Sequence, residues 1–156
     1  KMTSMAKHEW SLDELKSKAE AYCAAAEHCC SEVSYKLKQW GAKPDEIEKI
    51  TQHLIDHHYI DEERYSRAFT HDKVLYQGWG RMKIRAALYG KNISAQLITQ
   101  ALDSLDESEY MDTLKHVVAT KQRAIKSNDP MAREKLIRFL LQRGFTYDEI
   151  EFILKS

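Results

Sequence analysis

The sequence predicts an all-α fold, an elongated tandem array of three-helix repeats preceded by an N-terminal helix. Three observations predict it. The 156 residues include only 5 Gly and 2 Pro, too few for an all-β chain that turns every ten residues or so. Helix-capping patterns recur along the chain. One pattern of apolar residues, centred on a Gly or an Asn, occurs three times at spacings of 51 and 52 residues.

The first expected helix begins after Ser11 and continues to about His28. Residues 11–14, Ser-Leu-Asp-Glu, have the form of a capping box, in which the serine oxygen accepts a backbone N–H and the glutamate accepts one in return. The alanines that follow favour helix intrinsically. Residues 1–30 are therefore assigned to an N-terminal segment with one helix.

The repeat is centred on Gly41, Asn92 and Gly144. Gly and Asn are the residues best able to take the left-handed conformation that ends a helix. Apolar residues occupy the same four positions around each centre, and steps of three and four place them on one helical face. Two unrelated helix pairs joined by Gly could align in this way, but three centres with four shared columns favour a true repeat. The columns are Val33/Ile84/Leu136, Leu37/Leu88/Leu140, Ile47/Ile98/Ile150 and Ile50/Ala101/Ile153.

Each repeat is therefore predicted to be a helix, a tight turn and a second helix, and two repeats continue into a third helix. The third helix takes Asp61–Leu75 in the first repeat and about Ser108–Lys126 in the second. The predicted division of the chain is three-helix repeat 1 at 31–75, three-helix repeat 2 at 76–126 and a partial repeat 3 at 127–156.

Proline and a second capping box mark further helix starts. Pro44 and Pro130 are each expected in the first turn of a helix, where the missing N–H is tolerated. Thr146, three residues before Glu149, has the form of a capping box, and Ser94 can cap the helix after Asn92.

Composition excludes several classes of protein. With 24 Lys+Arg against 24 Asp+Glu the formal net charge is zero, and 43% of the residues are hydrophobic, so collagen-like and strongly charged disordered chains are excluded. No apolar run reaches the roughly 18 residues of a membrane span, and residues 1–10 lack the apolar core of a signal peptide. The odd set Cys23, Cys29 and Cys30 is no disulfide framework. We expect buried thiols in a cytoplasmic protein.

No catalytic or metal-binding motif is predicted. His53 and His57 share a helical face, but the zinc-protease pattern needs Glu directly after the first His, and Leu54 stands there. Solvent-facing histidines near a helix end are the favoured interpretation. Adjacent cysteines on a helix point about 100 degrees apart and do not easily share one tetrahedral ion. Phosphate-binding and G-x-S-x-G motifs do not occur, so we expect no cofactor, no metal and no enzyme.

Charges of one sign gather in blocks. Residues 44–63 hold seven acids and one Lys, whereas residues 73–102 hold five basic residues and no acid. Residues 103–112 then hold five acids and no base, and residues 121–143 hold seven basic residues and two acids. Stacked helices would gather these blocks into acidic and basic faces. Such faces are either solvated and merely balance one another, or contact phosphates or an acidic protein surface.

The segment from Tyr76 to Arg81 is the candidate binding element in the basic block. Two of the five glycines, Gly78 and Gly80, lie there beside Trp79. An interhelical turn explains the glycines but not the aromatic and basic residues around them. Rings beside basic side chains suit stacking on bases and contact with phosphates.

Three stretches carry a resemblance to a known family. Residues 59–69 read Tyr-Ile-Asp-Glu-Glu-Arg-Tyr-Ser-Arg-Ala-Phe, residues 78–88 read Gly-Trp-Gly-Arg-Met-Lys-Ile-Arg-Ala-Ala-Leu, and residues 139–145 read Phe-Leu-Leu-Gln-Arg-Gly-Phe. In order and spacing they resemble the RecX proteins, whose motifs are a tyrosine with an acidic pair, the run G-x-G-P-x-R-I-x-x-E-L, and F-L-x-x-R-G followed by Phe or Tyr. The resemblance covers about Cys30 to the C-terminus.

The sequence departs from the family pattern at three positions. Arg81 stands where the family has proline, Ala87 where it has glutamate, and Asn92 where it has glycine. Asn keeps the left-handed conformation available. The other two changes make the segment more basic, and they leave no basis for carrying over a contact made by the missing proline or glutamate.

The resemblance implies a small non-enzymatic regulator of the RecA recombinase, built from tandem three-helix repeats. It implies binding to the RecA filament on single-stranded DNA, and inhibition of ATP hydrolysis, strand exchange and coprotease activity. Single-stranded DNA would be contacted directly or through RecA, and we expect a monomer without a membrane partner. The expected contact residues are Tyr59, Asp61, Glu62, Arg64, Tyr76, Trp79, Arg81, Lys83, Arg85 and Lys91, and the expected turn and repeat anchors are Gly41, Gly78, Gly80, Asn92 and Gly144.

Two other functions stay open. Three-helix units resemble helix-turn-helix modules, so the protein could bind DNA directly. Alternatively, the repeats could form a scaffold for another protein partner.

Overall fold

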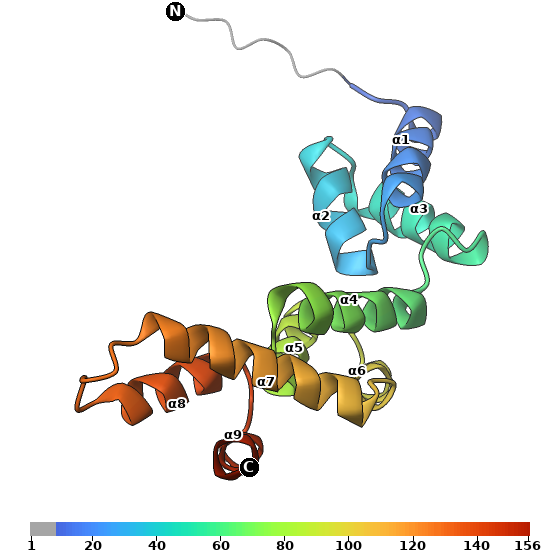
Figure 1. Cartoon of the computed structure of the whole chain (residues 1–156). Coiled ribbons are helices and arrows are strands. Elements are labelled where there is room, and N and C mark those ends of the chain that lie inside the picture. Colours follow the sequence, from blue (N-terminus) through green and yellow to red (C-terminus); the bar gives the residue numbers. More distant parts are fainter. Residues whose placement is uncertain (1–8) are drawn as a thin grey trace, which may run out of the picture. The chain divides into compact units, whose positions relative to one another are not determined.

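The computed structural model describes residues 9–156, and in that range the chain forms nine α-helices and no strand (Figure 1). The all-α prediction is confirmed, while most of the segment tested for a signal peptide lies outside the described residues. In the described range, no helix combines the length and the apolar character needed to cross a membrane. The helices are α1 (Leu12–Ala25), α2 (Cys30–Gln39), α3 (Pro44–Asp56), α4 (Glu62–Gln77), α5 (Arg81–Gly90), α6 (Ala95–Asp103), α7 (Glu107–Ala124), α8 (Ala132–Gln142) and α9 (Tyr147–Lys155).

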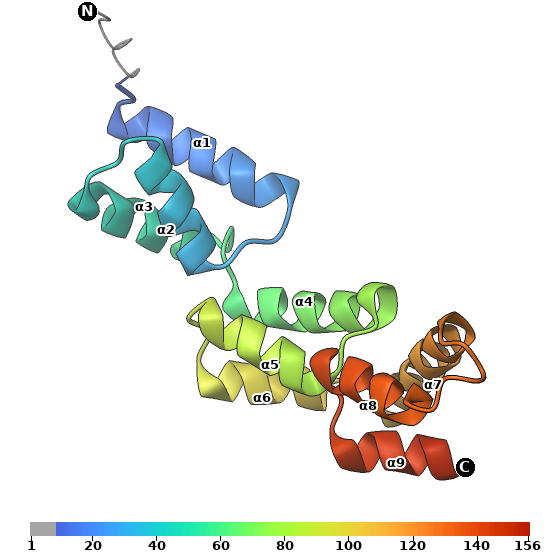
Figure 2. The ribbon, with the colours of Figure 1, turned by 90° about the vertical axis from the view of Figure 1, so that its left-hand side faces the viewer.

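The chain divides into two compact units. Unit 1 ends at Tyr65 and unit 2 comprises Ser66–Ser156, so the first turn of α4 belongs to unit 1 and the rest of that helix to unit 2. In unit 1, helices α1, α2 and α3 pack against one another. In unit 2, α5 packs against α6, and α7, α8 and α9 pack together (Figure 2).

The apolar columns predicted from the repeat form the cores of the two units. All twelve side chains are buried except Ile47, which is partly buried against the core of unit 1. Burying a side chain of this size stabilises a fold by about 1.5–3 kcal/mol, so these columns are a main source of stability. The other buried residues of the unit 1 core are Leu15, Ala19, Cys23, Ala42, Leu54 and Ile60.

The three predicted turn centres share one backbone geometry. Gly41, Asn92 and Gly144 have φ angles of 91°, 62° and 101°, so each is left-handed as predicted. In each turn the next residue donates its N–H to a carbonyl five residues earlier, which is the Schellman motif that closes a helix. These bonds are Ala42 to Leu37 (3.0 Å), Ile93 to Leu88 (3.1 Å) and Phe145 to Leu140 (3.2 Å), and in each pair both side chains are buried.

Helix α3 ends in the same motif, with a histidine at the left-handed position. His58 has φ 61°, and the following Tyr59 donates its N–H to the carbonyl of Leu54 at 2.8 Å. His57 and His58 are exposed, as predicted. The prediction is wrong for His53, which is half-buried because its Nε2 forms a 2.7 Å hydrogen bond with Glu20 of α1.

Helix boundaries follow the sequence patterns, with two differences. Capping boxes are present at Ser11 and Thr146, and Pro44 is in the first turn of α3. Helix α1 ends at Ala25, before the predicted His28, because the His28 ring stacks on Tyr22 with centroids 3.7 Å apart and the chain turns there toward α2.

Pro130 lies in the turn before α8 and not in its first turn. The turn is held by Asp129, whose carboxylate accepts the N–H of Met131 at 2.8 Å and pairs with Lys135 of α8. Helix α8 therefore begins at Ala132. The hydrogen bond from Lys135 and that from the Met131 backbone lower the pKa of the Asp129 carboxyl below its usual value.

We predict that His58→Gly raises the free energy of unfolding by about 1 kcal/mol. A left-handed conformation costs a residue with a Cβ about 1–2 kcal/mol, part of which the greater freedom of Gly in the unfolded chain offsets. His57→Gly is the matched control, because His57 has φ −101° and should lose stability on substitution. Urea unfolding followed by circular dichroism measures both. Equal effects of the two substitutions would show that the backbone at His58 is not strained.

We also predict that the three cysteines react slowly with a thiol reagent at pH 8 while the protein is folded. Burial, followed by the charge of Glu27, raises the pKa of Cys23 to about 11, and burial with Glu62 raises that of Cys30 to about 12. Cys29 is fully buried. Because the thiolate is the reactive form, labelling should become fast only in denaturant. Fast labelling of the folded chain would contradict the buried placement.

Candidate functional site

The segment between α4 and α5 is shaped by Gly78. Gly78 has φ 64°, and the following Trp79 donates its N–H to the carbonyl of Lys73 at 3.0 Å, which closes α4. A Cβ on Gly78 would lie 2.8 Å from the side chain of Val117 on α7. Glycine is needed here both for the turn and for the close approach of α7.

Gly80 lies in backbone contact with the turn between α8 and α9. Its N–H donates to the carbonyl of Arg143 at 2.7 Å, and the N–H of Met82 donates to the carbonyl of Gly144 at 3.0 Å. A Cβ on Gly80 would lie 2.4 Å from the carbonyl carbon of Gly144. Since no side chain fits between the two turns, this contact fixes where α5 begins.

Two lysines lie over the Trp79 ring. The Lys73 and Lys83 ammonium groups lie 4.6 and 4.4 Å from its centroid, and Phe69 meets the ring edge-on at 6.3 Å. Trp79 and both lysines are half-buried. Neither ammonium forms an ion pair with a carboxylate of residues 9–156. Cation–π contacts of this kind are worth about 0.5–1 kcal/mol at exposed sites and leave donors of the ammonium available to an anion.

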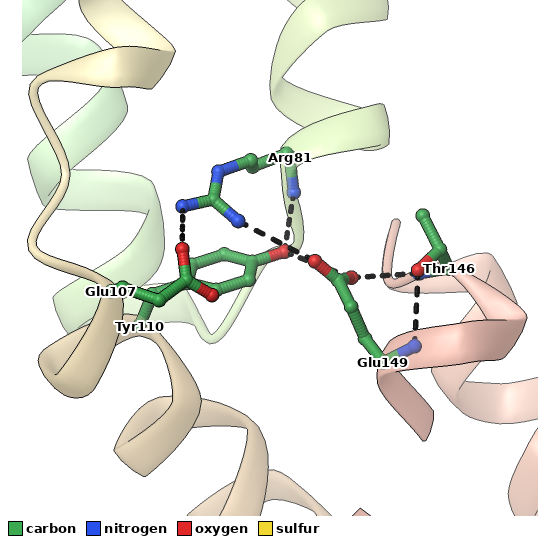
Figure 3. A network of polar contacts seen from close by, with 5 residues as sticks. All are labelled: Arg81, Glu107, Tyr110, Thr146 and Glu149. Atoms are coloured by element: carbon green, nitrogen blue, oxygen red, sulfur yellow. Dashed lines mark hydrogen bonds and ion pairs between the residues drawn. The ribbon is translucent and has the colours of Figure 1, made fainter. Parts of the chain in front are cut away.

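Arg81 instead joins three helices of unit 2 (Figure 3). Its guanidinium lies 4.0 Å from the ring centroid of Tyr110 and pairs with Glu107 at 2.9 Å and Glu149 at 3.4 Å. Its backbone N–H donates to the Tyr110 hydroxyl at 2.9 Å. Burial raises the pKa of that hydroxyl, which stays protonated and donates to Glu149. Glu149 also accepts the N–H of Thr146 in the α9 capping box.

The remaining predicted contact residues of unit 2 differ in exposure. Tyr76 is 81% exposed at the end of α4, Arg85 is exposed on α5, and Lys91 is half-buried at the C-terminus of α5. Met82 and Tyr89 are exposed at helical spacing on either side of Arg85, so the three share the outer face of α5. Only periodicity and exposure together identify this face.

A groove of about 620 Å³ in unit 2 was not predicted. It is lined by the C-terminal end of α4, one face of α7, Phe139 of α8, and Arg143 directly after α8. The Phe139 ring is flanked by Lys121 at 4.5 Å and by Arg143 at 5.1 Å. Arg143 also donates to the carbonyl of Gln77 at 2.7 Å. No local motif signals this groove, because three separate helices supply its walls.

The predicted contact residues of unit 1 have structural roles. Asp61 accepts the N–H of Arg64 at 3.0 Å and so caps α4, while Glu62 accepts the N–H of Cys30 at 2.8 Å and so holds the start of α2. Arg64 donates to Glu27 at 2.5 Å and to the carbonyl of His58. Tyr59 packs on the core of unit 1. Partner contact by these residues stays a prediction.

Within residues 9–156, no three His, Cys, Asp or Glu side chains converge in a way that could hold a metal ion. The described structure therefore adds no metal-ligating group to those weighed from the sequence. Unit 2 instead presents positively charged and aromatic side chains, which suit it to binding a partner.

The fold and this surface define a class: proteins of tandem three-helix units that present basic and aromatic side chains on part of their surface. A family model for the second three-helix domain of RecX matches residues 61–102, and one for its third three-helix domain matches residues 107–154. The chain belongs to the RecX family.

Individual proteins to which the chain is similar belong to the same family. The chain is 32% identical over 143 residues to regulatory protein RecX of Leptothrix cholodnii, covering 90% of this chain and 87% of that protein. It is 29% identical over 128 residues to regulatory protein RecX of Vibrio parahaemolyticus, covering 82% and 81%. A crystal structure of regulatory protein RecX is similar in fold, with a TM-score of 0.80 at 20% identity over 93% of this chain and 74% of that one.

The two family models group α4 with α5 and α6, and α7 with α8 and α9. Each family domain therefore begins with the helix that the sequence analysis assigned as the third helix of the preceding repeat. A three-helix repeat has the same period whichever helix is counted first. The division at 31–75, 76–126 and 127–156 stays a prediction.

We predict that Arg81→Ala lowers the free energy of unfolding by about 1–2 kcal/mol, because it leaves Glu107, Glu149 and the Tyr110 ring without their common partner. Arg85→Ala, on the exposed face of the same helix, is the control and should change stability by less than about 0.5 kcal/mol. Urea unfolding measures both. Equal, small losses would show that the network contributes little.

Proposed function

We propose that this chain is a non-enzymatic regulator of the RecA recombinase, which binds the RecA filament on single-stranded DNA and inhibits its ATPase, strand-exchange and coprotease activities. Membership of a family whose members are named regulatory proteins supports a regulatory role. The observation that supports binding is the Trp79 ring in contact with Lys73 and Lys83, two cations without a carboxylate partner in the described chain.

The proposed contact surface in unit 2 comprises Trp79, Lys73 and Lys83. The exposed Tyr76 and the α5 face with Arg85 and Tyr89 extend it. Ammonium groups without partners gain a counter-charge when they meet an acidic protein surface or a phosphate. Arg81 is not part of the surface in this proposal, since its charge is already matched by two glutamates.

Tandem units support binding to a polymer of identical protomers. Contacts that are individually weak can combine when several units of one chain engage neighbouring protomers, because each further contact is intramolecular. A single chain then suffices, so we propose that the protein acts as a monomer in the cytoplasm. It contacts DNA within the filament through RecA or directly.

The test is RecA-catalysed ATP hydrolysis on single-stranded DNA with increasing amounts of this protein. We expect inhibition at ratios near one per protomer or below, and filament disassembly in a parallel light-scattering measurement. The double variant Lys73→Glu/Lys83→Glu should need at least about tenfold more protein for the same inhibition, which corresponds to about 1.4 kcal/mol.

The matched control is Lys115→Glu/Lys126→Glu, which changes the net charge equally at two exposed lysines of unit 2. It should inhibit like the unchanged protein. Equal inhibition by both variants would remove the Trp79 surface from the contact. Absence of any effect of the unchanged protein on ATP hydrolysis and on the filament would overturn the proposed function.

A further inference from the structure

The groove of about 620 Å³ in unit 2 is charged with opposite signs along its length. The α7 residues that line it follow one another at steps of three and four, so they form one continuous face of that helix. Toward the N-terminus of α7 this face carries the acids Glu109 and Asp112, and toward the C-terminus it carries Lys121. Apolar groups also line the groove, among them Val117 and Leu75, the latter 55% exposed.

The charges at both ends are available to a partner. Glu109, Asp112 and Lys121 form no ion pair with any residue of the range 9–156. The Lys121 ammonium lies 4.5 Å from the ring centroid of Phe139, which holds it in place and leaves N–H donors for an anion. The groove therefore suits a segment that is basic at one end, acidic at the other and apolar between.

Helix α9 has an outer face with this order of side chains. Ile150 and Ile153 of α9 are buried, whereas Asp148, Phe152 and Lys155 are exposed and follow one another at steps of four and three. Phe152 is 66% exposed. Asp148 and Lys155 form no ion pair in the described part of the chain. One stripe of α9 thus reads acid, aromatic ring, base.

The two faces match when α9 of one copy runs antiparallel to α7 of another. An α-helix rises 1.5 Å per residue, so Asp148 and Lys155 are about 10 Å apart along α9, and Asp112 and Lys121 about 13 Å apart along α7. Antiparallel docking brings Asp148 to Lys121 and Lys155 to Asp112, with Phe152 between the two pairs. It also sets the two helix dipoles in opposite directions, which is favourable.

Helix α2 offers a similar order of side chains but is a poorer occupant. Its exposed Tyr35 lies between Glu32 and the exposed Lys38. The acid is already used, because Glu32 bonds both His28 at 3.1 Å and the Tyr65 hydroxyl at 3.2 Å. Docking of α2 would have to break these bonds, whereas docking of α9 breaks no ion pair.

We propose that copies of this chain associate head to tail, with α9 of one copy docked in the groove between α4, α7 and α8 of the next. The contact is heterologous, because the groove and the outer face of α9 are different surfaces of one molecule. It goes beyond the proposed function, since it requires this chain alone.

One ring and two exposed ion pairs make a weak contact, with a dissociation constant on the order of 1 mM. The dilute chain is therefore a monomer. Copies held side by side on one polymer reach local concentrations in the millimolar range, at which the contact forms. Its use there rests on the proposed function, whereas the contact itself does not.

The experiment is carbodiimide cross-linking, which joins a lysine directly to a carboxylate when the two form an ion pair. An equal mixture of unlabelled and ¹⁵N-labelled full-length chain is treated at about 1 mM and at about 10 μM, on either side of the expected dissociation constant. Mass spectrometry should find mixed-label peptides that join Lys121 to Asp148 and Asp112 to Lys155 at the higher concentration only. Mixed labels prove that two copies are joined.

Phe152→Ala should lower the yield of both mixed-label cross-links at least about tenfold, since it removes the apolar part of the contact. The matched control is Tyr35→Ala in unit 1, because Tyr35 is also an aromatic residue that is 66% exposed. Its yield should stay within about twofold of the unchanged chain. Circular dichroism checks that both variants keep their helices.

Charge reversal tests the direction of docking. Lys121→Asp and Asp148→Lys should each reduce the Asp112–Lys155 cross-link when present alone, because each places like charges together. A mixture of the two variants should restore it, since α9 of the second variant then meets a groove of opposite charge on the first.

Three results would overturn the proposal: no mixed-label cross-link at about 1 mM, equal yields from Phe152→Ala and Tyr35→Ala, or no recovery in the mixture of charge-reversal variants. The first would leave the groove to a helix of another protein. Failure here is distinguishable from failure of the proposed function, because the cross-linking is done without RecA and the ATPase assay does not require contact between copies.

Discussion

The left-handed residue that ends α2, α5 and α8 is the constraint on which the rest of the structure depends. A helix can reverse direction within two residues only if one of them accepts positive φ, and here Gly41, Asn92 and Gly144 do so. The Schellman hydrogen bonds that follow bring the next apolar residue onto the helix just ended. Every column of the core is in register because this turn is the same each time. The same left-handed turn occurs a fourth time at His58, which shows that the turn geometry outweighs the preference of a non-glycine residue for negative φ.

A second constraint separates structural charge from charge available for binding. Because Gly80 and Gly144 touch through their backbones, the first turn of α5 lies against the turn that precedes α9, and Arg81 comes within reach of Glu107 and Glu149. Arg81, the arginine of the Tyr76–Arg81 segment, therefore forms its ion pairs within unit 2. The lysines beside it, which are less distinctive in sequence, are the ones without carboxylate partners in the described chain. Pairing with carboxylates decides which basic residues remain for a partner, and a count of charges does not.

The net charge of zero illustrates the same point. Acids and bases alternate in blocks along the chain, and many of the acids hold the fold by capping helices or binding arginine and histidine. Several lysines instead lie against aromatic rings. A neutral protein can thus present cationic, aromatic sites suited to polyanions or acidic surfaces. Stacking on a ring holds an ammonium in place without neutralising it.

The sequence by itself determined the helices, the turn centres and the buried columns, because these depend on local hydrogen bonds and on spacing along one helix. It also indicated the family through ordered motifs, and it singled out Trp79 and Lys83. Only the tertiary structure decided that Asp61, Glu62 and Arg64 support the fold. It also decided that His53 bonds to Glu20, that Lys73 joins Lys83 at Trp79, and that Lys18 and Lys36 converge on Trp40. The reason is physical: periodicity within a helix fixes which face is buried. Which cation meets which carboxylate depends largely on residues far apart in sequence, such as His53 and Glu20 (33 positions) or Arg81 and Glu149 (68 positions), and only packing brings those together.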